Sequence, residues 1–470
     1  MTVAKPRDHL RQDGPRHGRG SGGGNRARWL LLLGAAAVAV PGSLLGLSRS
    51  LRLGAGGPPL LLVPWQAALL FGLAVVGAAF ILAWAAEAAQ VDVSASLAIA
   101  ALALIAVLPE YAVSFVFAWK SGVDVRHFGP GCLPPPGHGQ ADAPSNCSLV
   151  LANMTGSNRL LIGVGWALVV LLAWWRSRVS GERRGGITLA RGQSVELTYL
   201  ALACAYSLTL PLKRTVTLLD AAVLVGLFVA YSVRMARAPA GEPELFGPSA
   251  AIGGLRRWPR RALIVLLFLF AAGVILLVAE HFADALVATG SELGVNHFLL
   301  VQWLAPLASE APELLVAGFF AWRLQTGAAL TTLVSSKVNQ WTLLVGTLPL
   351  VFAVASHGAH GLPIDLAERK ELLLTAAQTV FALGILANLA LSVAEAIALF
   401  SLFAAQFVLH ALLPPPARGV EILLLSGVYL LLGLALVLRH RHELPRRLRD
   451  GLVTPYRELG EPEPGTHGGR

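Results

Sequence analysis

The amino-acid sequence predicts an all-α polytopic membrane protein made of two inverted five-helix repeats, with one extra span at each end. Three observations support this fold class. Of the 470 residues, 55% are hydrophobic and only 14% are charged, which is too few charges to cover a water-soluble globule. About 12 windows reach the roughly 20 apolar residues that a spanning helix needs. One helical motif also occurs twice.

The expected spans begin soon after a basic N-terminal tail. The first could instead be a signal sequence, because it follows basic residues and contains Pro41. The long tail before it favours a span. In chain order the windows are residues 29–47, 59–86, 93–119, 148–175, 194–212, 215–233, 262–288, 294–321, 328–353, 371–389, 391–413 and 420–438.

The net charge of +10 comes from Lys and Arg in the tails and connections. When the N-terminal tail is placed inside and the spans alternate, most of these residues fall in inside segments. That asymmetry follows the positive-inside rule. We therefore expect a multi-pass protein of the plasma (inner) membrane with both termini cytoplasmic. Its partner is the lipid bilayer, and basic tails without a folded motif do not indicate a nucleic-acid partner.

These spans and loops divide the chain. A linker rich in Pro, Gly and Arg separates two sets of spans. The expected units are a basic cytoplasmic tail at 1–28, an extra N-terminal span and loop at 29–58, a first repeat at 59–234, a cytoplasmic linker at 235–261, a second, inverted repeat at 262–413, an extra C-terminal span at 414–438 and a basic cytoplasmic tail at 439–470.

The loop at 120–147 is rich in Pro and Gly, and the alternation of spans places it outside. It contains two of the three cysteines, Cys132 and Cys147. An external location allows a disulfide between them. Three cysteines are too few for a cysteine-rich scaffold or a thiolate metal site.

The repeated motif is a Pro-Glu helix. "LPEYAVSFVFAWKSG" begins at Leu108 and "APELLVAGFFAWRLQTG" begins at Ala311, and the two align without a gap through the tryptophan. Five spans separate the starts of the two copies, so they cross the membrane in opposite directions. Inverted repeats of this kind are typical of secondary transporters that work by alternating access, with a site near the midplane.

The glutamates of this motif, Glu110 and Glu313, are candidates for cation binding. A carboxylate inside the bilayer costs several kcal/mol unless it is paired, hydrated or bound to a cation. The preceding prolines, Pro109 and Pro312, each remove a helix hydrogen bond and free a carbonyl. A carboxylate beside a free carbonyl suits a hard cation such as calcium or sodium. Ser309 shares a helix face with Glu313.

The helix after each Pro-Glu helix carries a second polar cluster, within "ANMTGSNRLLIG" in the first half and "LVSSKVNQWTLLVG" in the second. Hydroxyl side chains in such clusters can simply join helices. Arg159 and Lys337 indicate a functional role for these clusters, because each is a cation within a span. We expect the glutamates of the Pro-Glu helices to be their partners.

These elements resemble the calcium/cation antiporter superfamily, which contains sodium/calcium and cation/proton exchangers. Its members carry two inverted repeats, each with a Pro-Glu helix preceded by "GTS" and a helix that reads about "GNxxGSNxxN". Here "VLPE" (107–110) and "SEAPE" (309–313) resemble the first element, and "ANMTGSN" (152–158) and "LVSSKVNQ" (333–340) resemble the second. The resemblance covers most of residues 59–413.

The resemblance implies roles for individual residues. The implied ion-binding side chains are Glu110, Glu313, Ser309, Ser157, Asn158, Ser336 and Gln340. Candidates for coupling or charge compensation are Lys337, Glu310 and Arg159.

Three positions depart from the family pattern. Ala106 replaces a hydroxyl residue, Leu161 stands where the family has Asn or Asp, and Lys337 replaces an Asn. The first half therefore offers fewer ligands. A lysine in the site could occupy the place of a sodium ion, or pair with Glu310 or Glu313.

The expected function is secondary active cation antiport of the sodium/calcium exchanger type, in which calcium or sodium moves against sodium or protons. No bond is made or broken, so we expect neither an enzyme nor a cofactor. One alternative is a cation/proton antiporter in which Glu110, Glu313 and Lys337 exchange protons. Another is a degenerate protein that binds ions without transporting them, given the sparse ligands of the first half.

Overall fold

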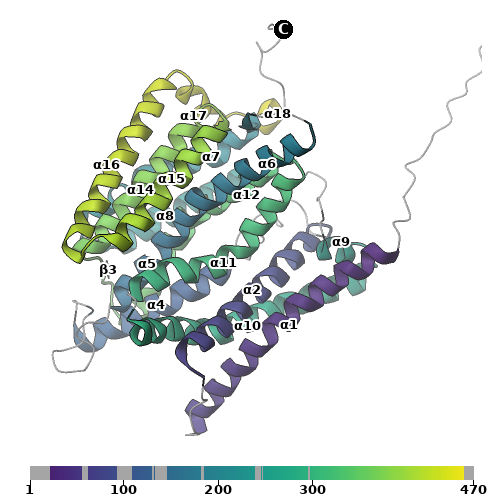
Figure 1. Ribbon diagram of the computed structural model, residues 1–470, viewed down its shortest axis with the longest axis vertical. Helices are drawn as coiled ribbons and strands as arrows, with labels where there is room; N and C mark the ends of the chain where they lie inside the picture. Colours follow the sequence, from purple (N-terminus) through teal and green to yellow (C-terminus); the bar gives the residue numbers. More distant parts are fainter. Residues whose placement is uncertain are drawn as a thin grey trace, which may run out of the picture.

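The computed structural model describes residues 22–55, 62–92, 108–129, 132, 145–181, 185–238, 245, 247–294 and 297–459. Within these ranges the chain is a bundle of long helices (Figure 1). Helices α1 (Gly22–Ala55), α2 (Pro64–Ala89) and α10 (Arg257–Leu293) pack together at one side of the bundle, and α14 (Leu366–Leu386) and α16 (Pro415–Arg439) pack together at the other.

The first half contains the helices up to the linker. Its elements are α1 (Gly22–Ala55), α2 (Pro64–Ala89), α4 (Leu108–Phe128), α5 (Asn146–Leu160), η1 (Leu161–Trp166), α6 (Ala167–Val179), β1 (Gly186–Thr188), η2 (Arg191–Gln193), α7 (Ser194–Ser207), η3 (Leu210–Leu212), β2 (Thr215–Val216) and α8 (Leu218–Met235).

The second half repeats this order after the linker. Its elements are α9 (Pro248–Gly253), α10 (Arg257–Leu293), α11 (His297–Trp322), α12 (Thr326–Asn339), η4 (Gln340–Leu344), α13 (Val345–Ser356), β3 (Leu362–Pro363), α14 (Leu366–Leu386), β4 (Ala390–Ser392), α15 (Val393–Leu412), α16 (Pro415–Arg439), α17 (Leu444–Leu452) and α18 (Tyr456–Leu459).

Eight helices of the described residues are long and apolar enough to cross a membrane, and the two segments of α11 make a ninth if they count as one bent span. Three of the predicted windows fall short of that standard. The window at 93–119 begins in residues that lie outside the described ranges, α14 carries charges in its first turns, and the apolar part of α15 is short. Each of these windows still contains a helix, so the all-α prediction is correct.

Two miniature antiparallel sheets join the halves and reveal their symmetry. In one, Ile187 of β1 lies opposite Leu391 of β4; in the other, Val216 of β2 lies opposite Leu362 of β3. A single 175-residue offset converts Ile187 to Leu362 and Val216 to Leu391. The two pairings are therefore related by the symmetry that exchanges the two halves, as inverted repeats require.

The polar helices of the two halves share an unusual local geometry. The helix that starts at α5 widens into a π turn at Leu161–Trp166, and the helix that starts at α12 widens at Gln340–Leu344. These turns begin at equivalent positions of the two repeats. Single π turns within α-helices occur frequently at functional sites.

The extra helices pack by close backbone approach. A Cβ on Gly77 of α2 would lie 2.6 Å from the carbonyl oxygen of Ala35 in α1, and one on Gly433 of α16 would lie 2.8 Å from the nitrogen of Phe381 in α14. Small residues at such crossings are how helices associate in lipid, where no hydrophobic force drives them together.

The C-terminal segment, expected as a basic tail, contains two further helices. Residues 444–452 form α17, which packs against α7, and residues 456–459 form α18, which contacts η2 (Figure 1). Arg191 holds Asp450 through two bonds of 2.7 Å, and Arg234 donates to the carbonyl oxygens of Asp450 and Gly451. Paired charges, which the one-dimensional pattern does not reveal, dock this segment.

Candidate ion-binding site

Glu110 lies in the first turn of α4 and its side chain is only 2% exposed. Gln340, from the polar helix of the other half, donates its amide nitrogen to Glu110 Oε2 at 3.3 Å. The Glu110 carboxyl also faces Ser157 of α5. Glu110 therefore joins groups from both repeats in the interior of the bundle.

Glu310 and Glu313 supply the matching acids from α11. The same amide nitrogen of Gln340 donates to Glu310 Oε1 at 2.7 Å. The carboxyl groups of Glu110 and Glu310 therefore share one donor and lie close together. Glu313 faces Ser336 of α12. The Glu313–Ser336 pair is equivalent to the Glu110–Ser157 pair, and each joins a Pro-Glu helix to the polar helix of its own half.

The backbone of α11 changes direction at this point. The segments Val301–Ala311 and Glu313–Trp322 meet at an angle of 56°. Pro312 lies between them and has no N–H to donate into the helix, which accounts for a break here. Pro109 stands in the first turn of α4, at the start of the described part of that helix.

At the centre of the site, two equivalent residues of the repeats contact each other. The Lys337 ammonium donates to the side-chain oxygen of Asn158 at 2.8 Å and also to the Asn158 carbonyl. Lys337 is fully buried, and its ammonium lies 5.6 Å from the centre of the Trp341 ring. Residues related by a two-fold axis meet only at that axis. The ammonium thus marks the point where the two halves meet.

Several oxygens at this centre are buried without a hydrogen-bond partner. They are Glu110 Oε1, Glu310 Oε2, Glu313 Oε2, Gln340 Oε1 and Ser336 Oγ. Among the described residues, no three His, Cys, Asp or Glu side chains lie close enough to hold a metal ion. A cation bound here would take further ligands from amide, hydroxyl or main-chain oxygens, which calcium accepts readily.

Arg159 does not pair with the glutamates of the Pro-Glu helices, so that expectation was wrong. Its guanidinium lies 2.8 Å from Glu371 of α14, while Gln302 of α11 donates to the same carboxylate at 3.2 Å. The Arg159 guanidinium also lies 5.2 Å from the Trp303 ring centre. Arg159 points away from the ion site because its neighbour Asn158 takes the face that meets Lys337.

One other expected contact also differs. Lys337 donates to Asn158 rather than to Glu310 or Glu313, although it lies near Glu110 and Glu310. Ser309, expected as an ion ligand, donates its hydroxyl to the carbonyls of Ala305 and Pro306 in its own helix, at 3.2 and 3.3 Å. Ala106 and its neighbour Val107 lie outside the described residues.

The structure also brings in residues that the sequence patterns did not single out. Asn153 donates to Ser114 at 2.7 Å, one helical turn from Glu110 on the same face of α4. Glu371 and Gln302 hold Arg159. The four-residue spacing of Ser114 from Glu110 could have indicated that Ser114 lies near the site. The contacts of Arg159 with its partners depend on which helices are neighbours, and hydrophobic periodicity does not reveal that.

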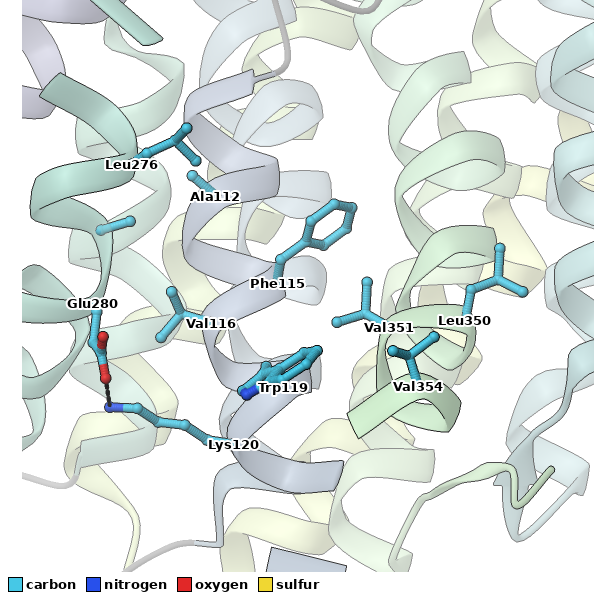
Figure 2. A pocket seen from close by; sticks show the side chains of 11 residues that line it. Ala112, Phe115, Val116, Trp119, Lys120, Leu276, Glu280, Leu350, Val351 and Val354 are labelled. Atoms are coloured by element: carbon cyan, nitrogen blue, oxygen red, sulfur yellow. Dashed lines mark ion pairs between the residues drawn. The ribbon is translucent and has the colours of Figure 1, made fainter. Parts of the chain in front are cut away.

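A cavity of about 610 Å³ opens beside α4 but does not belong to this site (Figure 2). Its walls are mostly apolar and come from α4, α10 and α13. Ala112, Phe115 and Trp119 line it, and they lie on the opposite face of α4 from Glu110. At one end, Lys120 pairs with Glu280 at 3.7 Å and with Asp284, which ties α4 to α10.

A disulfide links the two helices on either side of the loop after α4. Cys132 and Cys147 form a disulfide that joins the end of α4 to the start of α5. The remaining cysteine, Cys204 of α7, is free and buried.

Comparisons with known proteins agree with this architecture. The family model described as sodium/calcium exchanger protein matches residues 63–236 and 263–412. A solved structure described as the H+/Ca2+ exchanger CAX is similar at 36% identity, with a TM-score of 0.78 over 93% of this chain and 99% of that one. Native YfkE shares the fold, with 12% identity and a TM-score of 0.53 over 86% of this chain and 100% of its own. No curated protein matches the sequence.

The family match spans well over half of the chain and includes both Pro-Glu helices and both polar helices. The chain therefore belongs to the sodium/calcium exchanger family of multi-pass membrane cation antiporters.

Proposed function

We propose that this protein exchanges calcium for protons across the membrane, with Glu110, Glu310 and Glu313 as the groups that bind the two ions in turn. The observation that carries the proposal is the meeting of Glu110 and Glu310 at the Gln340 amide nitrogen. Two neighbouring buried carboxylates repel each other when both are ionised. A proton or a cation relieves that repulsion, so binding one ion favours release of the other.

Calcium fits the donor set of this site. The unpartnered oxygens are carboxylate, amide and hydroxyl oxygens from both halves, which are hard ligands suited to calcium. Ser157 and Ser336 stand beside the two Pro-Glu carboxylates. We assign them, with Gln340 and Asn158, to the ligand shell, and Glu313 to the second half of the site.

Lys337 favours protons over sodium as the counter-ion. Its Nζ atom donates to Asn158 at the symmetry axis, so a side chain that cannot leave already fills this position. A tethered side chain at this position competes with a bound monovalent cation. The similarity to a protein described as an H+/Ca2+ exchanger supports the same choice.

The inverted repeats suggest how the site changes sides. The halves are tied by one small sheet at each end of the molecule, and the site lies between them. Movement of one set of helices relative to the other can expose the carboxylates first to one side and then to the other. We place the protein in the plasma (inner) membrane with both termini in the cytoplasm, because the arginine-rich ends then face inside.

Calcium uptake into everted vesicles under an imposed proton gradient tests the site. Glu110→Gln and Glu313→Gln each remove one ionisable group while keeping the shape of the side chain. We expect either change to reduce uptake to the level of vesicles without the protein. Glu292→Gln, an exposed residue at the end of α10, is the matched control and should transport normally.

Normal uptake in both site variants would show that the ions bind elsewhere. If the wild-type protein is folded and inserted yet moves no cation under a proton or a sodium gradient, the protein binds ions without transporting them.

A further inference from the structure

The symmetry of the halves identifies a second pair of buried acids outside the ion site. Thr217 and Asp220 form the capping box that starts α8, and Ser392 and Glu395 form the one that starts α15. These boxes are 175 residues apart, as are the strands of the two small sheets. The same offset places Glu196, near the start of α7, in the position equivalent to Glu371 of α14.

The two equivalent acids have different surroundings. Glu371 is paired with Arg159 at 2.8 Å. The residue equivalent to Arg159 in the second half is Val338, so α12 offers no cation to α7 at that position. Glu196 is only 4% exposed, and its Oε2 atom has no hydrogen-bond partner.

The charged groups near Glu196 are committed to other partners. Arg191, which precedes α7, pairs with Asp450 of α17. Arg234 of α8 donates to the carbonyls of α17 and lies over the Tyr456 ring at 4.8 Å. No cation in the described part of the chain forms an ion pair with Glu196. A buried carboxylate without a cation is neutral only when it holds a proton.

Hydroxyl groups lie between this part of α7 and the candidate ion site. Glu196 and Tyr199 share a face of α7, and the Tyr199 ring centre lies 5.6 Å from that of Tyr231 in α8. The Tyr231 hydroxyl donates to Ser335 Oγ of α12 at 3.2 Å. Ser335 precedes Ser336, whose hydroxyl faces Glu313. Each of these groups can accept one proton and donate another.

We propose that Glu196 is a proton-binding site on the side of the C-terminal helices, and that it passes protons to and from Glu313 by way of Tyr231 and Ser335. This inference rests on the proposed exchange of calcium for protons. Each transfer breaks one O–H bond and forms another, so nothing is oxidised or reduced. The equivalent acid of the other half, Glu371, is held by Arg159 and does not take this role.

Two transport modes of the reconstituted protein separate proton delivery from calcium binding. Exchange of external calcium for internal calcium needs no net proton movement, whereas uptake driven by a proton gradient does. In Glu196→Gln we expect calcium/calcium exchange at the wild-type rate. We expect proton-driven uptake to fall by about a hundredfold or more, a loss of the size seen when a positioned proton-transfer group is removed. Glu196→Asp should restore most of it.

Tyrosine variants test the route. Tyr231→Phe removes the hydroxyl that contacts Ser335 and should slow proton-driven uptake selectively. Tyr199→Phe is the matched control, because the Tyr199 ring packs against that of Tyr231, with 5.6 Å between ring centres, but its hydroxyl has no place in the route.

Equal proton-driven uptake in Glu196→Gln and the wild type would overturn the inference, as would an equal loss of both transport modes. The result for the wild type is separate: if it shows calcium/calcium exchange but no proton-driven uptake, the proposed coupling ion is wrong.

Discussion

Asn158 in the first half and Lys337 in the second occupy equivalent positions, and they contact each other across the symmetry axis. One position later the roles reverse, because the residue equivalent to Arg159 in the second half is Val338. Each half thus carries one buried cation where the other has a neutral residue. Lys337 enters the ion site, whereas Arg159 turns away to Glu371.

The comparison shows how one backbone design supports two chemical roles. The sheets, capping boxes and π turns repeat in both halves, so the scaffold is symmetric. The buried charges do not repeat. Arg159 stabilises the contact between α5 and α14, and its absence from the second half leaves Glu196 to bind a proton. Stability and proton handling are therefore separated between equivalent positions.

Breaking the Arg159–Glu371 pair should have the largest effect on stability. Glu371→Gln leaves a buried guanidinium without its counter-charge, and we expect it to lower the free energy of unfolding by about 3–5 kcal/mol. The double variant Arg159→Leu/Glu371→Leu should recover most of that loss. Thermal unfolding in detergent measures both. A stable Glu371→Gln protein would contradict a structural role for the pair.

Gln340 distinguishes the π turn of the second half from that of the first, where Leu161 stands. Gln340→Leu removes the donor shared by Glu110 and Glu310. A hydrogen bond to a charged group contributes about 1.5–3 kcal/mol, so the ionised carboxylates become less stable and calcium competes less well with protons. We expect the apparent Kd for calcium to rise about tenfold. Calcium titration at constant pH measures it, with Leu161→Met as the control that should change nothing.

The capping boxes should show the smallest difference, because the scaffold is symmetric there. The Thr217 hydroxyl accepts from the nitrogen of Asp220 at 3.3 Å, and the Ser392 hydroxyl accepts from that of Glu395 at 3.2 Å. Thr217→Ala and Ser392→Ala should each cost about 1 kcal/mol. Thermal unfolding of the two variants side by side would show a broken symmetry if one cost far more than the other.

The sequence was sufficient for the fold class, the inverted Pro-Glu helices and the polar helices that follow them. These features rest on local signals such as hydropathy, proline and a repeated motif. The partner of Arg159 and the docking of α17 depend on which distant helices are neighbours. The same holds for Glu196, whose significance emerges only when the small sheets fix the register between the halves.

The identity of the coupling ion is the most direct test of the account. In proteoliposomes, calcium uptake by the wild type should follow an imposed proton gradient and be unaffected by an imposed sodium gradient. The reason is that the Lys337 side chain occupies the position at the symmetry axis that a sodium ion would take. Lys337→Asn should weaken that distinction and let sodium inhibit or drive uptake. Wild-type uptake that follows sodium and ignores protons would contradict the account.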